Sequence, residues 1–152
     1  MKNTFILLLF LSVFSSFEKK YYYSEFKPVD SKNWKQTDTL TYLVDIDDSN
    51  AYYDIFVSVR HQKDYEFSNI WLNIIDSYYE VKETYRLQVP LFKQDGKPYG
   101  KVSGSLCTQT IPFQKRTKFP KSGNYKIKIV QLMRKEPLNG ISDVGIIIEK
   151  KQ

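Results

Sequence analysis

The stretch that decides the fold reads YDIFVSVR and occupies residues 53–60. Apolar residues alternate in it with residues of mixed character, and an extended chain points such alternate side chains to opposite faces. Tyr53, Ile55, Val57 and Val59 therefore share one face, and Asp54, Phe56, Ser58 and Arg60 share the other. The pattern predicts a long β-strand with one face committed to a core.

Similar short strands are expected on both sides of this one. The predicted strands lie at residues 40–46, 70–75, 85–89, around Val102, 125–131 and 143–149. Turn-forming stretches separate them, among them residues 47–50, 95–96 and 122–124. Seven or eight such strands without an amphipathic helix predict an all-β fold, an antiparallel β-sandwich. Jelly-roll and immunoglobulin-like connectivities both fit this pattern.

The length of 152 residues suits one domain. The chain contains 12 Tyr and 10 Phe, and aromatic enrichment favours strands over helices. We expect a signal peptide at residues 1–16, an extended N-terminal segment at 17–35 and the sandwich domain at 36–150. The middle segment is polar and aromatic without a clear period, and it contains Pro28.

The first residues have the pattern of a secretory signal peptide. Lys2 is followed by a mostly apolar run at residues 4–14 and then by two small residues, Ser15 and Ser16. That run is too short to span a bilayer, which takes about 20 apolar residues. A bacterial lipoprotein carries its lipid on a cysteine just after this region, whereas here Ser16 occupies the candidate position. The sequence predicts export without a lipid attachment site.

The net charge of +6 is spread along the chain rather than gathered in a tail. The densest basic run, residues 115–118, is short and interrupted by Thr117. Lysines of this kind commonly solubilise an exposed strand edge. We therefore predict no nucleic-acid partner.

No constellation for catalysis or metal binding stands out. Cys107 is the only cysteine and His61 the only histidine, which argues against a triad, a thiolate zinc site or a His-based metal site. Cys107 is expected to be a small buried residue rather than a nucleophile. Asp45, Asp47, Asp48 and Asp54 could bind calcium, but turn propensity explains them. The prediction is no catalytic residue, no metal and no cofactor.

Two alternatives remain open on the residues alone. A glycosidase needs two carboxylates close in space, and Glu80, Glu83 and Asp95 are available for such a pair. The tyrosine clusters at residues 21–23 and 78–79 could stack on sugars or pack between sheets. A carbohydrate-binding β-sandwich module of a polysaccharide-utilisation system is therefore the alternative function.

The most specific pattern consists of several stretches in a fixed order. It comprises Trp34, Arg60 followed by residues 64–72, Gly100, Gly104, residues 119–125, 131–134, 138–141 and 143–145, and Ile148. From Trp34 to Glu149 the chain resembles the GldH family of gliding-motility lipoproteins.

The resemblance implies a non-enzymatic cell-envelope protein, an accessory component of a bacterial gliding motility or type IX secretion apparatus. Its partners would be envelope proteins of that machinery, and membrane association would need lipidation or those partners. The expected location is the periplasm or the periplasmic face of the outer membrane. The residues that could bind a partner are Trp34, Arg60, Asn69, Gln131 and Arg134, each with a structural alternative such as a carboxylate partner for Arg60.

Overall fold

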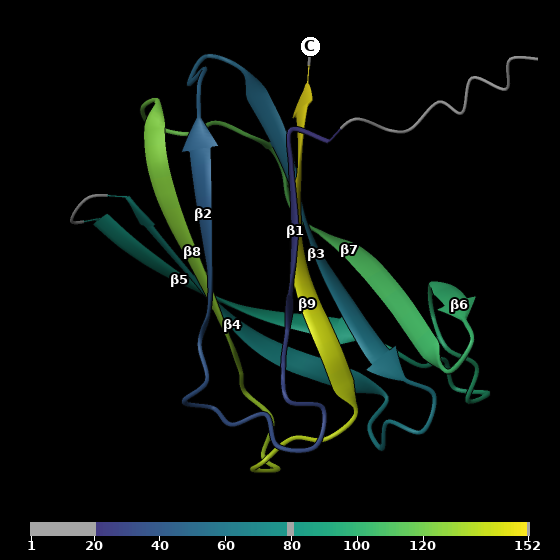
Figure 1. Ribbon diagram of the computed structural model, residues 1–152. Coiled ribbons are helices and arrows are strands. Elements are labelled where there is room, and N and C mark those ends of the chain that lie inside the picture. The colour runs from purple at the N-terminus through teal and green to yellow at the C-terminus, as the bar shows by residue number, and fades with distance from the viewer. Residues whose placement is uncertain (1–20, 79–80, 152) are drawn as a thin grey trace, which may run out of the picture.

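The computed structural model describes residues 21–78 and 81–151, and in that part of the chain it is entirely β (Figure 1). The strands are β1 (Tyr23–Pro28), β2 (Leu40–Ile46), β3 (Tyr52–Gln62), β4 (Asn69–Tyr78), β5 (Val81–Pro90), β6 (Lys101–Ser103), β7 (Leu106–Thr117), β8 (Gly123–Gln131) and β9 (Ile141–Lys151). The described residues include no helix able to cross a membrane. The predicted signal peptide, with Ser16, lies outside them.

The strands form two antiparallel sheets that pack face to face, as the predicted sandwich requires. One sheet has the order β1-β9-β3-β7-β6 and the other β2-β8-β4-β5. Apart from the short β6, the pairs β1·β9, β2·β8, β3·β7 and β4·β5 are those of one long hairpin wound into two layers. This is the connectivity of a jelly roll. It decides between the two connectivities that the sequence pattern allows.

The core lies between the sheets and comes from alternate residues of the central strands. In β3 the predicted inward set is buried, with Tyr53, Ile55, Val57 and Val59 at most 2% exposed. Facing it, β8 buries Tyr125, Ile127 and Ile129, while β4 buries Ile70, Leu72 and Ile74. Burying one such side chain stabilises the fold by about 1.5–3 kcal/mol. The alternation in the sequence therefore predicts which face of these central strands points inward.

The extended segment predicted at residues 17–35 contains a strand of the first sheet. Residues of β1 pair with β9 from Tyr23 opposite Ile148 to Pro28 opposite Asp143. Its inward side is polar at the open edge of the sandwich, where Lys27 forms an ion pair with Glu25 at 2.7 Å. The Lys27 ammonium also lies 5.6 Å from the centre of the Tyr42 ring. An edge strand of this kind needs no apolar alternation.

On the outer side of the same strand pair, Phe26 covers Gly145. A Cβ atom added to Gly145 would lie 2.7 Å from two atoms of the Phe26 ring, so a side chain there would displace the ring. The guanidinium of Arg60 stacks on the ring at 4.9 Å from its centre and meets Asp143 at 3.3 Å. Because Gly145 has no side chain, the Phe26 ring packs directly against its backbone.

The predicted solvated run at residues 115–118 begins at the outer end of β7. The ladder between β3 and β7 shifts register around Ile55, and Arg116 has a positive φ of 50°. Its backbone N–H donates to the Asp54 carboxylate at 2.8 Å. Lys115, Arg116 and Lys118 are exposed, as expected of a strand edge.

We expect Gly145→Val to destabilise the protein by about 1–3 kcal/mol, because the new side chain overlaps the Phe26 ring. Valine is otherwise well suited to a strand, so Phe26→Ala in the same chain should recover part of the loss. Urea unfolding of both single variants and the double variant measures this coupling. Strictly additive effects would show that the ring and the glycine are not coupled.

Candidate functional site

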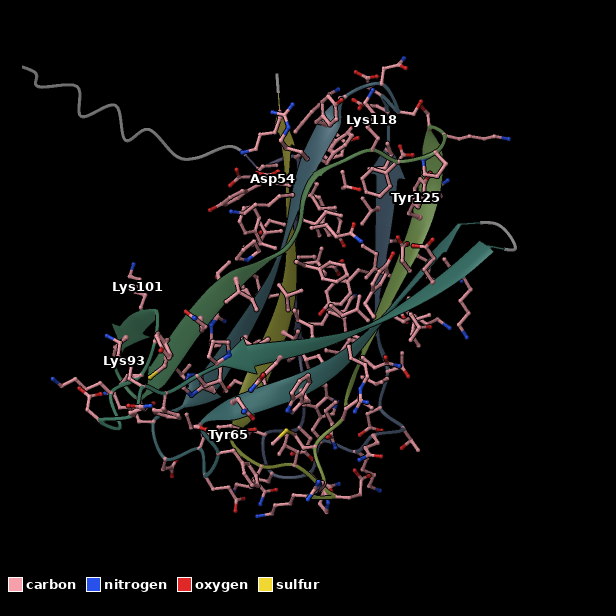
Figure 2. The ribbon with its side chains drawn as sticks, turned by 180° about the vertical axis from the view of Figure 1, so that it is seen from behind. Asp54, Tyr65, Lys93, Lys101, Lys118 and Tyr125 are labelled. Carbon is pink, nitrogen blue, oxygen red and sulfur yellow. The ribbon has the colours of Figure 1, made fainter. Side chains whose placement is uncertain are left out.

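Several of the stretches that carry the family resemblance meet at one end of the sandwich. Three connections lie side by side there: residues 29–39 between β1 and β2, residues 63–68 between β3 and β4, and residues 132–140 between β8 and β9 (Figure 1). We call this region the loop end. Figure 2 shows Tyr65 at this end and Asp54, Lys118 and Tyr125 towards the opposite end.

Trp34 belongs to the core and lies where the core meets the loop end. Its side chain is 1% exposed, and its indole N–H donates to the carbonyl of Asp38 at 3.1 Å. The backbones of Trp34 and Leu138 exchange two hydrogen bonds of 3.1 and 2.9 Å, which join the first loop to the third. Leu138 is fully buried. Trp34 and Leu138, about a hundred positions apart, thus form an antiparallel β-bridge.

Gln131 connects the same two loops through its side chain. It is fully buried, and its amide N–H groups donate to the Glu136 carboxylate at 3.0 Å and to the Trp34 carbonyl at 3.5 Å. Its amide oxygen accepts from the backbone N–H of Met133 at 2.7 Å. A buried amide with its polar atoms satisfied in this way fixes the path of the loop that follows β8.

Glu136 completes this network, although the sequence alone does not single it out. Its two carboxylate oxygens accept from the backbone N–H of Gln36, each at 3.1 Å. The side chain of Gln36 in turn donates to the carbonyl of Met133 at 2.7 Å. Both partners come from loops without a periodic alternation in sequence, so only the fold brings them together.

The middle loop packs on the third through Tyr65 and Gly140. Tyr65 is 6% exposed, and a Cβ atom at Gly140 would lie 3.0 Å from its ring. The positive φ of 86° at Gly140 also favours glycine. The Tyr65 hydroxyl donates to the carbonyl of Asn69 at 3.2 Å, at the start of β4. The loop end is therefore packed and internally hydrogen-bonded.

The five residues predicted to bind a partner separate in the structure. Trp34 and Gln131 are buried in the loop end, and Asn69 is half-buried beside it. Arg134 is exposed on the third loop. Arg60 lies on the outer face of β3, paired with Asp143, which agrees with the carboxylate partner considered for it. Only the exposed and half-buried members can touch a partner directly.

His61 and Cys107 are cross-strand neighbours in the core near the loop end. Both are fully buried, and they are paired across β3 and β7. The His61 ring lies against Phe92 and Tyr65, and burial lowers the pKa of its imidazole. The group is therefore neutral at physiological pH. Cys107 is the only cysteine of the chain, and its buried thiol is enclosed by the fold.

The acidic residues considered for calcium binding lie at the opposite end, and three of the four have lysine partners. Lys150 contacts Asp47 at 3.1 Å and Asp48 at 3.5 Å, while Lys151 contacts Asp54 at 3.1 Å. The hydrogen bond from Lys150 holds the pKa of Asp47 below its usual range. Within the described residues no three ligand-type side chains converge as a metal site would require.

Two carboxylates do lie side by side at the far end of the β4–β5 hairpin. Asp76 and Glu83 are cross-strand neighbours on its inner side, and the Tyr85 hydroxyl donates to Glu83. Burial, and secondarily the charge of Glu83, raise the pKa of Asp76. One oxygen of Asp76 is buried without a hydrogen-bond partner.

The described tyrosines do not form an exposed row. Tyr22 donates to the Asp45 carbonyl at 2.8 Å and packs edge-on against Tyr53. The side chains of Arg116 and Lys118 cover the ring of Tyr52, with the two cations 4.9 and 4.7 Å from the ring centre. The side chains of residues 78–80 lie outside the described part. Tyr22 and Tyr52 are thus held by contacts within the protein.

Fold and site together define an all-β protein of jelly-roll type, closed at one end by a packed set of loops that brings its motif residues together. The family model for the GldH lipoprotein matches residues 21–148. The chain belongs to this family. It is 31% identical over 156 residues to the gliding motility lipoprotein GldH homolog of Christiangramia forsetii, covering 97% of this chain and 95% of that protein.

A second relative is the gliding motility lipoprotein GldH of Flavobacterium johnsoniae. It is 30% identical over 158 residues, which cover 99% of this chain and 98% of that protein. Both relatives are named for gliding motility. Membership of a lipoprotein family implies an exported protein of the cell envelope, attached to a membrane.

Gln131→Ala should destabilise the protein by roughly 2 kcal/mol, because Met133 and Glu136 lose a buried hydrogen-bond partner. Urea unfolding gives the change in free energy, and amide exchange should be fastest in residues 132–140. Gln88→Ala, an exposed change on β5, is the matched control and should cost under about 0.5 kcal/mol. Equal stability of the two variants would contradict the proposed role of Gln131.

Asp76→Asn should raise the free energy of unfolding at neutral pH by under about 1 kcal/mol, since part of the carboxyl still meets water. The raised pKa means that ionised Asp76 opposes folding above that pKa. The gain should vanish near pH 3, below the ordinary aspartate pKa of about 3.9. Asp64→Asn, at an exposed loop position, should show no such pH-dependent gain.

Proposed function

We propose that this protein is a non-catalytic accessory component of a bacterial gliding motility or type IX secretion apparatus, and that the loop end binds a protein of that apparatus. The observation that carries the proposal is the convergence of separate motif stretches on one end of the sandwich. Trp34 and Gln131 hold the loops there, and Arg134 projects from them.

The packing of the loop end suits protein recognition. A network of buried hydrogen bonds fixes its backbone, so little conformational entropy is lost when a partner binds. Its exposed rim carries Arg134 together with Lys135, which pairs with Glu66 of the neighbouring loop. Arginine is enriched among the residues that dominate binding at interfaces. Arg134 is therefore the proposed contact, with Gln131 as a positioning residue.

The proposed location is the periplasm or the periplasmic face of the outer membrane. The predicted signal peptide and the lipoprotein family support export to the envelope. Ser16, in place of a cysteine at the predicted lipid position, makes contact with envelope partners the more important means of attachment.

A non-catalytic role agrees with the chemistry of the described residues. His61 is neutral and enclosed, Cys107 faces it in the core, and Asp76 and Glu83 are immediate neighbours in one hairpin. A general acid or base needs access to a substrate atom within hydrogen-bonding distance. These groups support the fold rather than an exposed reaction site.

Arg134→Glu should reduce recovery of envelope partners in pull-downs from detergent-treated membranes by about tenfold, as expected for loss of an interface arginine. In a deletion strain this variant should fail to restore colony spreading and protein secretion. Its thermal unfolding should stay close to that of the unchanged protein, because Arg134 is exposed.

The matched control is Lys121→Glu, which makes the same charge change at the opposite end of the sandwich, where the side chain is also exposed. This variant should bind partners and restore spreading. If both variants behave like the unchanged protein, the loop end is not the binding surface.

A further inference from the structure

The outer face of the β2-β8-β4-β5 sheet carries cations that form no ion pair with the other described residues. Its outward residues alternate with the buried residues of the core, so they share one surface. We call this surface the basic face and define it by Leu43, Trp71, Lys82, Arg86, Lys126 and Lys128. One row crosses all four strands, from Leu43 through Lys126 and Ser77 to Lys82.

Four positive charges lie on this face without a carboxylate. No ion pair within the described residues involves Lys82, Arg86, Lys126 or Lys128. Among the described outward positions of the sheet, only Asp45 is acidic, and it lies towards the end of β2 opposite Asn124. The basic face therefore presents an uncompensated positive field.

The outer face of the other sheet is different. There Arg60 pairs with Asp143 at 3.3 Å, and Lys151 pairs with Asp54 and Glu149 at 3.1 and 3.0 Å. Its exposed end is occupied by Tyr52 under Arg116. The cations Arg60 and Lys151 of that face thus have carboxylate partners, which the four cations of the basic face lack among the described residues.

Apolar side chains are exposed among the cations. Leu43 is 65% exposed on the edge strand β2, and Trp71 is 38% exposed on β4. Half-buried Ile75 and Val130 lie between them on neighbouring strands. Tryptophan and leucine beside lysine and arginine are the residues that insert at a lipid headgroup boundary. Lysine, by contrast, is depleted in protein–protein interfaces.

We propose that the basic face lies against an anionic phospholipid surface. The four cations attract the negatively charged headgroups, and Trp71 and Leu43 enter the boundary between headgroups and acyl chains. The contact orients the sandwich with its strands along the membrane, so the loop end points sideways and stays open to a protein partner. This inference does not depend on what the loop end binds.

The test is co-sedimentation of the purified full-length protein with vesicles. Vesicles of phosphatidylcholine and phosphatidylglycerol should bind the protein, and vesicles of phosphatidylcholine alone should bind it much less. Each cation near an anionic surface contributes about a fivefold factor in binding, so Lys126→Gln with Lys128→Gln should weaken binding about 25-fold. Added salt should weaken it further.

The matched control is Lys63→Gln with Lys101→Gln, which removes the same charge from exposed positions outside the face. It should keep nearly full binding. An equal loss in both double variants would show attraction to net charge alone and would overturn the proposal, as would no binding of the unchanged protein to anionic vesicles.

Tryptophan fluorescence supplies an independent measurement, because the chain has two tryptophans and Trp34 is buried. Anionic vesicles should shift the emission to shorter wavelength, and Trp71→Phe should abolish the shift. A photo-crosslinking residue at position 126 should form adducts with lipid in cells. Adducts with an acidic protein or with a second copy of this chain would overturn the proposal and assign the face to that occupant.

Discussion

The structure depends on strand β9 lying between β1 and β3. Its inward residues Val144, Ile146 and Ile148 are fully buried, and they form the centre of the first sheet's contribution to the core. The pairing joins the last strand of the chain to the first and to the third, so the sheet closes only after nearly the whole chain is present. Such long-range pairing brings loops distant in sequence together. The loop end is the direct consequence, because the loop preceding β9 must meet the loop following β1.

The distribution of charge follows from the same two-layer arrangement. Each sheet has one face in the core and one in solvent, and the two solvent faces differ in how their charged side chains are paired. On the first sheet, carboxylates of β9 and β3 neutralise the neighbouring cations, as between Asp143 and Arg60. On the second sheet, Lys126 and Lys128 have no such neighbours. A sheet face with several cations and no carboxylate partners favours one orientation of the sandwich near an anionic surface.

Much of the fold could be predicted from the sequence, because the burial of one strand face imposes alternation. The prediction of β2 at residues 40–46 is confirmed, as is the inward set of β3. The sequence pattern does not distinguish strand β1 from the rest of the extended segment at residues 17–35. The reason is that Glu25 and Lys27 pair with each other at an open edge instead of entering the core. The jelly-roll order depends on contacts between distant strands, which local patterns do not contain. For the same reason the sequence does not identify Glu136 as the partner of Gln131.

Residues of the family pattern do not all lie where a partner can contact them, as Trp34, Gln131 and Arg134 show. The first two are buried and hold the loops through hydrogen bonds to Leu138, Met133 and Glu136. Residues with such roles make a chain recognisable because the loop end cannot be built without them, whatever it binds. The choice of partner must then rest on exposed side chains of the same loops, of which Arg134 is one. A change in partner would alter this rim and leave the buried network in place.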